Sequence, residues 1–167
     1  RIDFIDEPVN LGFDCPLDLH CTYTRDQLLV AMDFMKPATV REGVKWLPEK
    51  QLDVFFVTLN KSDKDYSPTT MYNDYSINSR LFHWQSQSTT GADSTTGQRY
   101  IHHAERGSHV LLFVREFRTD LCGTAPYPFL GEAEYVSHSG SKPMNIVWRL
   151  RKEIPAKYLR KTMQVIG

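Results

Sequence analysis

One stretch limits the possible folds more than any other, because it is almost continuously apolar: residues 52–59, LDVFFVTL. A run of this length and composition is typical of a strand that is buried on both faces or central to a sheet. A second strong strand is predicted over residues 109–117, HVLLFVREF. The chain is therefore expected to fold around a well-buried sheet.

The other predicted strands are less apolar. They cover residues 41–47, 81–87, 127–138 and 144–150, in which apolar and polar residues tend to alternate. The last two flank a turn, SGSK, which indicates a hairpin with a loop of about four or five residues.

Short helices are predicted from capping signals and helical spacing. Thr24 and Gln27 have the spacing of a capping box, and the helix that they begin should end near Lys36, before Pro37. A second helix, capped by Ser94 or Thr95, is expected to carry the residues from Arg99 to His103, and Pro155 begins a third, amphipathic helix.

Neighbouring strands are joined mostly by loops and not by full helical crossovers. This pattern predicts an α+β domain with a strongly bent antiparallel sheet, or a small β-barrel, and short flanking helices. Residues 1–22 are expected to be a linker or arm from a preceding region, and residues 23–167 a single domain. Because the sequence begins with Arg1, we expect it to be a piece of a longer protein.

Composition is that of a globular protein, with 41% hydrophobic residues in 167. No apolar run approaches the roughly 18 residues that a membrane helix needs. The three cysteines have no metal-ligand spacing, which favours reduced thiols and a cytoplasmic protein. The formal net charge is zero, but residues 141–167 hold seven basic residues and one acidic residue. This asymmetry indicates either a local basic face or a solvated surface that binds nothing.

Signatures of catalysis are missing from the sequence. Asp63 and Asp65 come nearest to a carboxylate cluster for a metal, and no GxxxxGK[ST], GxGxxG or GxSxG motif occurs. We therefore expect no catalytic residue, no metal and no cofactor, and a binding role instead of an enzymatic one.

The candidate binding residues gather in one polar and aromatic stretch, RLFHWQSQSTTGADSTTGQRYIHH. Trp84 and Tyr100 can stack on a base, and Arg99 can form bidentate hydrogen bonds with guanine or a phosphate. The amides of Gln85 and Gln87 can pair with a base edge. The alternative is that Trp84 belongs to the core and the glutamines pair with the backbone. The full predicted DNA-binding set is Lys61, Lys64, Tyr75, Trp84, Gln85, Ser86, Gln87, Arg99, Tyr100, His103 and Lys142.

Several segments resemble one bacterial family: DVFFVTLNKSDKDYSPTTMYNDYSINSRLFHWQSQSTT, TGQRYIHH, VLLFVRE, FLGEAEYVSH and SGSKPMNIVWRL. They are similar to the uncharacterised C-terminal domain, a domain of unknown function, of DEAD/DEAH-type helicases, many of which carry a phospholipase D-like nuclease domain. The resemblance covers roughly residues 23–159, and FHWQSQS and SKPMNIVW are its specific parts. It implies a helicase region before this domain and a place in restriction or phage defence, and it brings no known catalytic residue.

Two functions follow as expectations. The first is a DNA-recognition module of the helicase that binds double-stranded DNA and reads modified or flipped bases, by analogy with the barrels of the SRA and PUA-like group. Its aromatic-walled pocket would be formed by Tyr75, Trp84, Gln85 and Tyr100. The second is a protein-docking or oligomerisation module that couples the helicase to a nuclease partner. Neither function involves a membrane.

Overall fold

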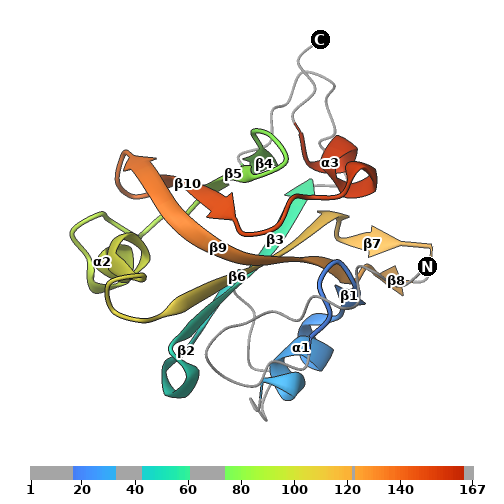
Figure 1. Ribbon diagram of the computed structural model, residues 1–167, viewed down its shortest axis with the longest axis horizontal. Helices are drawn as coiled ribbons and strands as arrows, with labels where there is room; N and C mark the ends of the chain where they lie inside the picture. Colours follow the sequence, from blue (N-terminus) through green and yellow to red (C-terminus); the bar gives the residue numbers. More distant parts are fainter. Residues whose placement is uncertain (1–16, 33–42, 61–73, 122, 164–167) are drawn as a thin grey trace.

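The computed structural model of the chain describes residues 17–32, 43–60, 74–121 and 123–163, and one large sheet dominates it (Figure 1). The eighth strand of this sheet, β1 (Thr22–Tyr23), pairs with β9 outside the main path. After β6, β7 (Thr119–Asp120) and β8 (Gly123–Thr124) form a separate small hairpin. The main path runs in the order β2 (Val44–Leu47), β3 (Leu52–Asn60), β6 (His109–Phe117), β9 (Tyr127–Ser139), β10 (Asn145–Leu150), β5 (Leu81–Gln85) and β4 (Tyr75–Ser76).

The two most apolar strands, β3 and β6, lie side by side inside the sheet, as their sequences predict. They run parallel, because the chain passes through β4, β5 and α2 (Thr95–His102) before it returns as β6, and a crossover of that length permits parallel pairing. The other described pairs are antiparallel. The sheet is therefore mixed, and the expectation of a wholly antiparallel sheet is wrong for this pair.

The sheet is open, with β2 and β4 at the two ends of its path among the described strands. The expected alternative of a small closed barrel is therefore wrong. The coarser expectation, an α+β domain with short helices beside a large sheet, is confirmed.

Short helices cover both faces of the sheet in the described part of the chain. α1 (Arg25–Ala31) packs on one face, and α2 and α3 (Ala156–Thr162) contribute to the core on the other. Alternation along β3 divides its side chains between the two cores, with Val54 and Phe56 toward α1 and Phe55 and Val57 toward α2. None of the described helices is long and apolar enough to cross a membrane.

The helix starts agree with the capping signals. Thr24 Oγ1 accepts a hydrogen bond from the Gln27 backbone N–H at 3.1 Å, and Gln27 Oε1 accepts one from the Thr24 N–H at 3.0 Å, so the capping box is confirmed. Ser94 caps α2 through the Gly97 N–H. α1 ends at Ala31; the expected end near Lys36 lies outside the described residues.

Residues 17–22, which we expected to belong to a linker, take part in the fold. Leu17 and Leu19 are buried in the core beside α1. The His20 N–H donates to the Phe129 carbonyl at 2.9 Å, and the Phe129 N–H donates to the Cys21 carbonyl at 2.8 Å. A helicase region before these residues stays a prediction.

Candidate functional site

Trp84 lies in the core and not at an open surface. The residue is 4% exposed, and its ring stacks on Phe55 with the centroids 4.2 Å apart. The ring centroids of Tyr100 and Trp148 lie 5.4 and 6.3 Å from that of Trp84. Tyr100 is fully buried and donates its hydroxyl to Gln87 Oε1 at 3.2 Å. The protein's own rings therefore fill the place where we expected a platform for a base.

The neighbouring polar side chains contact other parts of the protein. Ser86 Oγ accepts a hydrogen bond from the Met144 N–H at 2.8 Å, and Gln85 Nε2 donates to Asn145 Oδ1 at 3.3 Å. Trp84 and Gln85 are consecutive in β5, so their side chains point to opposite faces of the sheet. The indole and this carboxamide do not converge, and the expectation of one pocket is wrong in this respect.

Arg99 is held by Asp53 of β3. Its Nε and Nη2 donate to Asp53 Oδ2 and Oδ1 at 2.8 and 2.9 Å, and its guanidinium lies 4.4 Å from the ring centroid of Trp46. Burial tends to lower the pKa of Arg99, but the hydrogen bond and charge of the Asp53 carboxylate outweigh this effect and raise it. The guanidinium is thus engaged in an internal ion pair, not presented to a guanine.

His103 is buried and contacts backbone groups on both sides of its ring. Nδ1 lies 3.1 Å from the Ser108 carbonyl oxygen, and Nε2 accepts a hydrogen bond from the Tyr135 N–H at 3.0 Å. This pair of contacts requires the proton on Nδ1. Burial lowers the pKa of His103, so the ring serves as a neutral structural group.

Two more of the predicted residues, Tyr75 and Lys142, belong to the described part of the chain. Tyr75, in the edge strand β4, stacks on His83 with the centroids 4.7 Å apart, on the face of β5 opposite to Trp84. Lys142 is exposed in the turn between β9 and β10. Two further residues lie outside the described part of the chain, Lys61 and Lys64.

A different feature, a hollow at the C-terminal end of β6, combines cations with apolar walls. β9 pairs with β6 as far as Phe113 and Phe129, and the more N-terminal part of β9 pairs with β1. The register shifts after Leu112, where Gly131 has a φ of 99°, and such a bulge redirects a strand. The regular pairing of β6 with β9 ends at this point, and residues of both strands beyond it line the hollow.

Two prolines, Pro126 and Pro128, lie where the regular pairing of β9 with β6 ends. The Phe129 N–H points to the Cys21 carbonyl, and successive N–H groups along a strand point to opposite sides. The nitrogen of Pro128 therefore faces β6. Proline has no N–H to donate, so Pro128 cannot contribute to a regular ladder with the end of β6. Before β9 begins, the Ala125 N–H donates to the Arg118 carbonyl at 2.9 Å.

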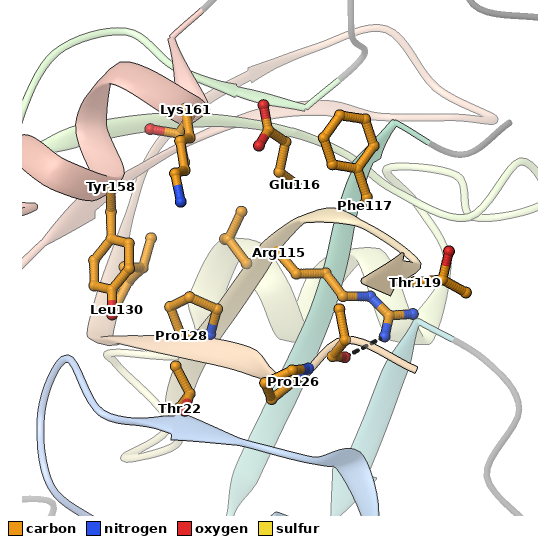
Figure 2. A pocket seen from close by; sticks show the side chains of 13 residues that line it. Thr22, Arg115, Glu116, Phe117, Thr119, Pro126, Pro128, Leu130, Tyr158 and Lys161 are labelled. Carbon is orange, nitrogen blue, oxygen red and sulfur yellow. Dashed lines mark hydrogen bonds between the residues drawn. The ribbon is translucent and has the colours of Figure 1, made fainter. Parts of the chain in front are cut away.

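The hollow has a volume of about 270 Å³ and walls from β6, β9 and α3, with single residues of β1 and β7 (Figure 2). Few polar groups stand among apolar and aromatic surfaces, which is the usual character of a ligand site. Phe117 is 40% exposed, so part of one wall is open to a ligand. The principal wall residues are Arg115 and Phe117 of β6, Pro126 and Pro128 at the start of β9, and Tyr158 and Lys161 of α3.

Arg115 is the half-buried cation of the hollow. Its Nε donates to Thr58 Oγ1 at 2.8 Å, and its Nη1 donates to the Ala125 carbonyl at 2.7 Å. The pKa of Arg115 is lowered, mainly by burial and further by the positive charges of Arg25 and Arg118, while Tyr127, whose ring centroid lies 4.2 Å from the guanidinium carbon, opposes this effect. Within the described part of the chain no carboxylate forms an ion pair with Arg115. An anion in the hollow would therefore offset the repulsion among these cations.

One cation of the basic C-terminal segment, Lys161, also lines the hollow. Lys157 does not line it, although its Nζ lies 4.9 Å from the ring centroid of the lining residue Tyr158. Glu116 is the one acidic side chain among the described lining residues. We did not predict Arg115 as a site residue, although a charge within an apolar strand, HVLLFVREF, was a signal that could have found it.

A second charged cluster lies nearer the start of β6. Glu132 is 4% exposed, and its Oε2 lies 2.6 Å from His109 Nδ1. Arg151 Nε lies 3.2 Å from Glu132 Oε1 without the alignment of a hydrogen bond, and Arg151 Nη2 lies 3.4 Å from Glu134 Oε1. No group of three or more His, Cys, Asp or Glu side chains that could hold a metal occurs among the residues described.

Comparisons with known proteins give a family. A comparison with curated proteins finds no match. The sequence matches the family described as Domain of unknown function (DUF3427) over residues 17–161. This match extends from the buried Leu17 to Lys161 in the wall of the hollow and takes in the whole sheet. The chain therefore belongs to the DUF3427 family.

Proposed function

We propose that this chain is a DNA-binding module that holds the phosphate backbone at the hollow between β6, β9 and α3. The observation that carries the proposal is Arg115, a half-buried guanidinium with two neighbouring arginines and no ion pair to a described carboxylate. A phosphate is a suitable counter-charge, because arginine binds it through paired charge-assisted hydrogen bonds.

The charge around the hollow supports a small number of phosphate contacts. Arg115 and Lys161 line it, and the exposed Arg118 adds a positive charge close to Arg115. The whole chain is neutral, so a large non-specific attraction to DNA is not expected. Each phosphate contact lowers the logarithm of the binding constant by roughly 0.7–0.9 per tenfold rise in salt. We therefore expect a measurable but shallow dependence on salt.

The position of the module in a larger protein is inferred from the sequence resemblance. We infer that it holds DNA for a DEAD/DEAH-type helicase motor of a restriction or defence system and has no catalytic activity of its own. The reading of a modified base by an SRA- or PUA-like pocket has no support from the packed rings of Trp84 and Tyr100, so the proposed contact is to the backbone.

Fluorescence anisotropy with labelled DNA at low salt tests the proposal. Arg115→Gln and Lys161→Gln should each weaken binding about tenfold, which corresponds to about 1.4 kcal/mol. Arg106→Gln is the matched control, because Arg106 is exposed and lies before the opposite end of β6. It should change the affinity less than twofold. Lack of binding to any DNA at low salt would refute the proposal.

A second candidate function, docking to a second copy or to a nuclease partner, is favoured by exposed apolar side chains. Phe117 is 40% exposed and Leu121, in the small hairpin that follows, is 106% exposed. Light scattering at increasing concentration tests it for a second copy. Association that Leu121→Ser abolishes would favour docking, and a strict monomer that retains no added nuclease subunit would count against it.

A further inference from the structure

The recessed position of Arg115 restricts which form of DNA can reach it. Hydrogen bonds to Thr58 and to the Ala125 carbonyl hold the guanidinium within the hollow. Contact with it therefore requires a ligand to enter. Elements that read a duplex instead project from the protein into a groove that is about 12 Å wide. A recessed guanidinium at the end of a strand is poorly placed to do so.

The size and walls of the hollow fit one nucleotide unit. Its volume of about 270 Å³ is close to the lower end of the range of about 300–1,000 Å³ for small-molecule sites. Phe117, Tyr158 and the rings of Pro126 and Pro128 provide surfaces against which a base can lie. Single-stranded nucleic acids are bound in this way, with unstacked bases on aromatic side chains and the backbone along cations.

The charges of the hollow give such a nucleotide an orientation. Figure 2 shows Glu116 and Phe117 next to each other, while the guanidinium of Arg115 extends toward Thr119 and Pro126. A carboxylate repels a phosphate, but it can accept a hydrogen bond from the amino group of cytosine. Thymine has no such group. The phosphate thus belongs beside Arg115 and the base beside Glu116 and Phe117.

We infer that the hollow takes up one unstacked nucleotide of single-stranded DNA, with its phosphate on Arg115 and its base against Phe117, at the rim that Glu116 lines. The inference rests on the proposed DNA binding and adds to it a strand form and a base preference. Single strands should bind better than a duplex of the same length, and oligo-dC should bind better than oligo-dT.

The test uses the whole chain and labelled DNA of about 12 nucleotides, within the usual site sizes for single-strand binding. We expect single-stranded dC to bind about tenfold more tightly than a duplex and about threefold more tightly than single-stranded dT. Phe117→Ala should weaken single-strand binding about fivefold and leave duplex binding unchanged. Glu116→Gln should remove most of the difference between dC and dT. Both side chains are at least partly exposed, so neither change should prevent folding.

The outcomes separate the inference from the proposed function. Equal affinity for single strands and duplex, weakened equally by Arg118→Gln, would retain DNA binding and overturn nucleotide uptake. Binding of single strands that Phe117→Ala does not weaken would also overturn it. Lack of binding to either form would overturn the proposed function itself. Competition by deoxycytidine monophosphate against bound dC, lost in Lys161→Gln, would support the inference with a ligand that has no duplex form.

Discussion

Asp53 and Arg99 form a two-pronged ion pair in which the carboxylate is fully buried, with N–O distances of 2.8 and 2.9 Å. Loss of one partner leaves the other charge buried, which typically costs about 3–5 kcal/mol. We expect Arg99→Ala to lower the free energy of unfolding in urea by about this amount. The pair Asp53→Asn with Arg99→Gln leaves no buried charge and should be more stable than Arg99→Gln alone. If the double variant were the less stable, the ion pair would not be the reason for the loss.

Trp84 should contribute to stability and not to DNA affinity. It stacks on Phe55 and is 4% exposed, and removal of such a ring costs about 3–5 kcal/mol. We expect Trp84→Ala to destabilise the fold by this amount and Trp84→Phe to do so less. Binding by folded Trp84→Phe should equal that of the parent. A large loss of affinity with little loss of stability would restore the base-stacking role that the sequence suggested.

The stability of the fold should decline in mild acid because His103 is buried. Burial lowers the pKa of His103 from the ordinary value of 6.5, and the Ser108 carbonyl and the charges of Glu132, Glu134 and Asp53 oppose this effect without cancelling it. The unfolded chain therefore takes up a proton before the folded chain does. The contribution to stability is complete above about pH 6.5 and is lost as the pH falls below that value.

Urea unfolding at about pH 7.5 and about pH 5.5 measures this pH dependence. Two variants show which histidines cause it. His103→Gln should be less stable at neutral pH but should lose less on acidification than the parent. His20→Gln should also reduce the loss, because burial and the charge of Lys157 lower the pKa of His20. An unchanged pH dependence in both variants would assign the effect to other groups.

Glu132 and Glu134 make a matched pair of carboxylates on one strand. The Glu132 side chain is 3% exposed and contacts His109 and Arg151, whereas that of Glu134 is 45% exposed. Glu132→Ala leaves its partners partly solvated, so we expect a loss of about 1–3 kcal/mol. Glu134→Ala should change the free energy of unfolding by less than about 0.5 kcal/mol. If urea unfolding showed similar losses of unfolding free energy for the two variants, burial would not determine how much the Glu132 contacts stabilise the fold.

The sequence indicated the strands and helix starts well, because those signals are local. The apolar run of β3 and the capping box at Thr24 gave the right element in the right place. The parallel pairing of β3 with β6 could not be predicted in the same way, because it depends on where the chain returns after a long crossover. The open sheet has the same cause: closure depends on how the distant strands β2 and β4 are placed.

The candidate site was partly within reach of the sequence. Alternation in the predicted strand β5 already places Trp84 and Gln85 on opposite faces of the sheet. The sequence alone was therefore sufficient to exclude their convergence on one ligand. Arg115 is different. Its surroundings come from Thr58, Ala125 and Arg25, which lie in three distant segments. The charge within an apolar strand marks Arg115 as unusual, but the residues that surround it in the hollow cannot be inferred from that local pattern.

Pro128 also limits how a partner can attach beside β6. Since it offers no N–H group on that side, an extended peptide cannot add itself to β9 there by an uninterrupted backbone ladder. For the same reason, two copies of the protein cannot form a regular strand-to-strand pairing along this part of β9. A ligand in the hollow must therefore be recognised by side chains. Single substitutions of these side chains can then change which ligand the hollow selects.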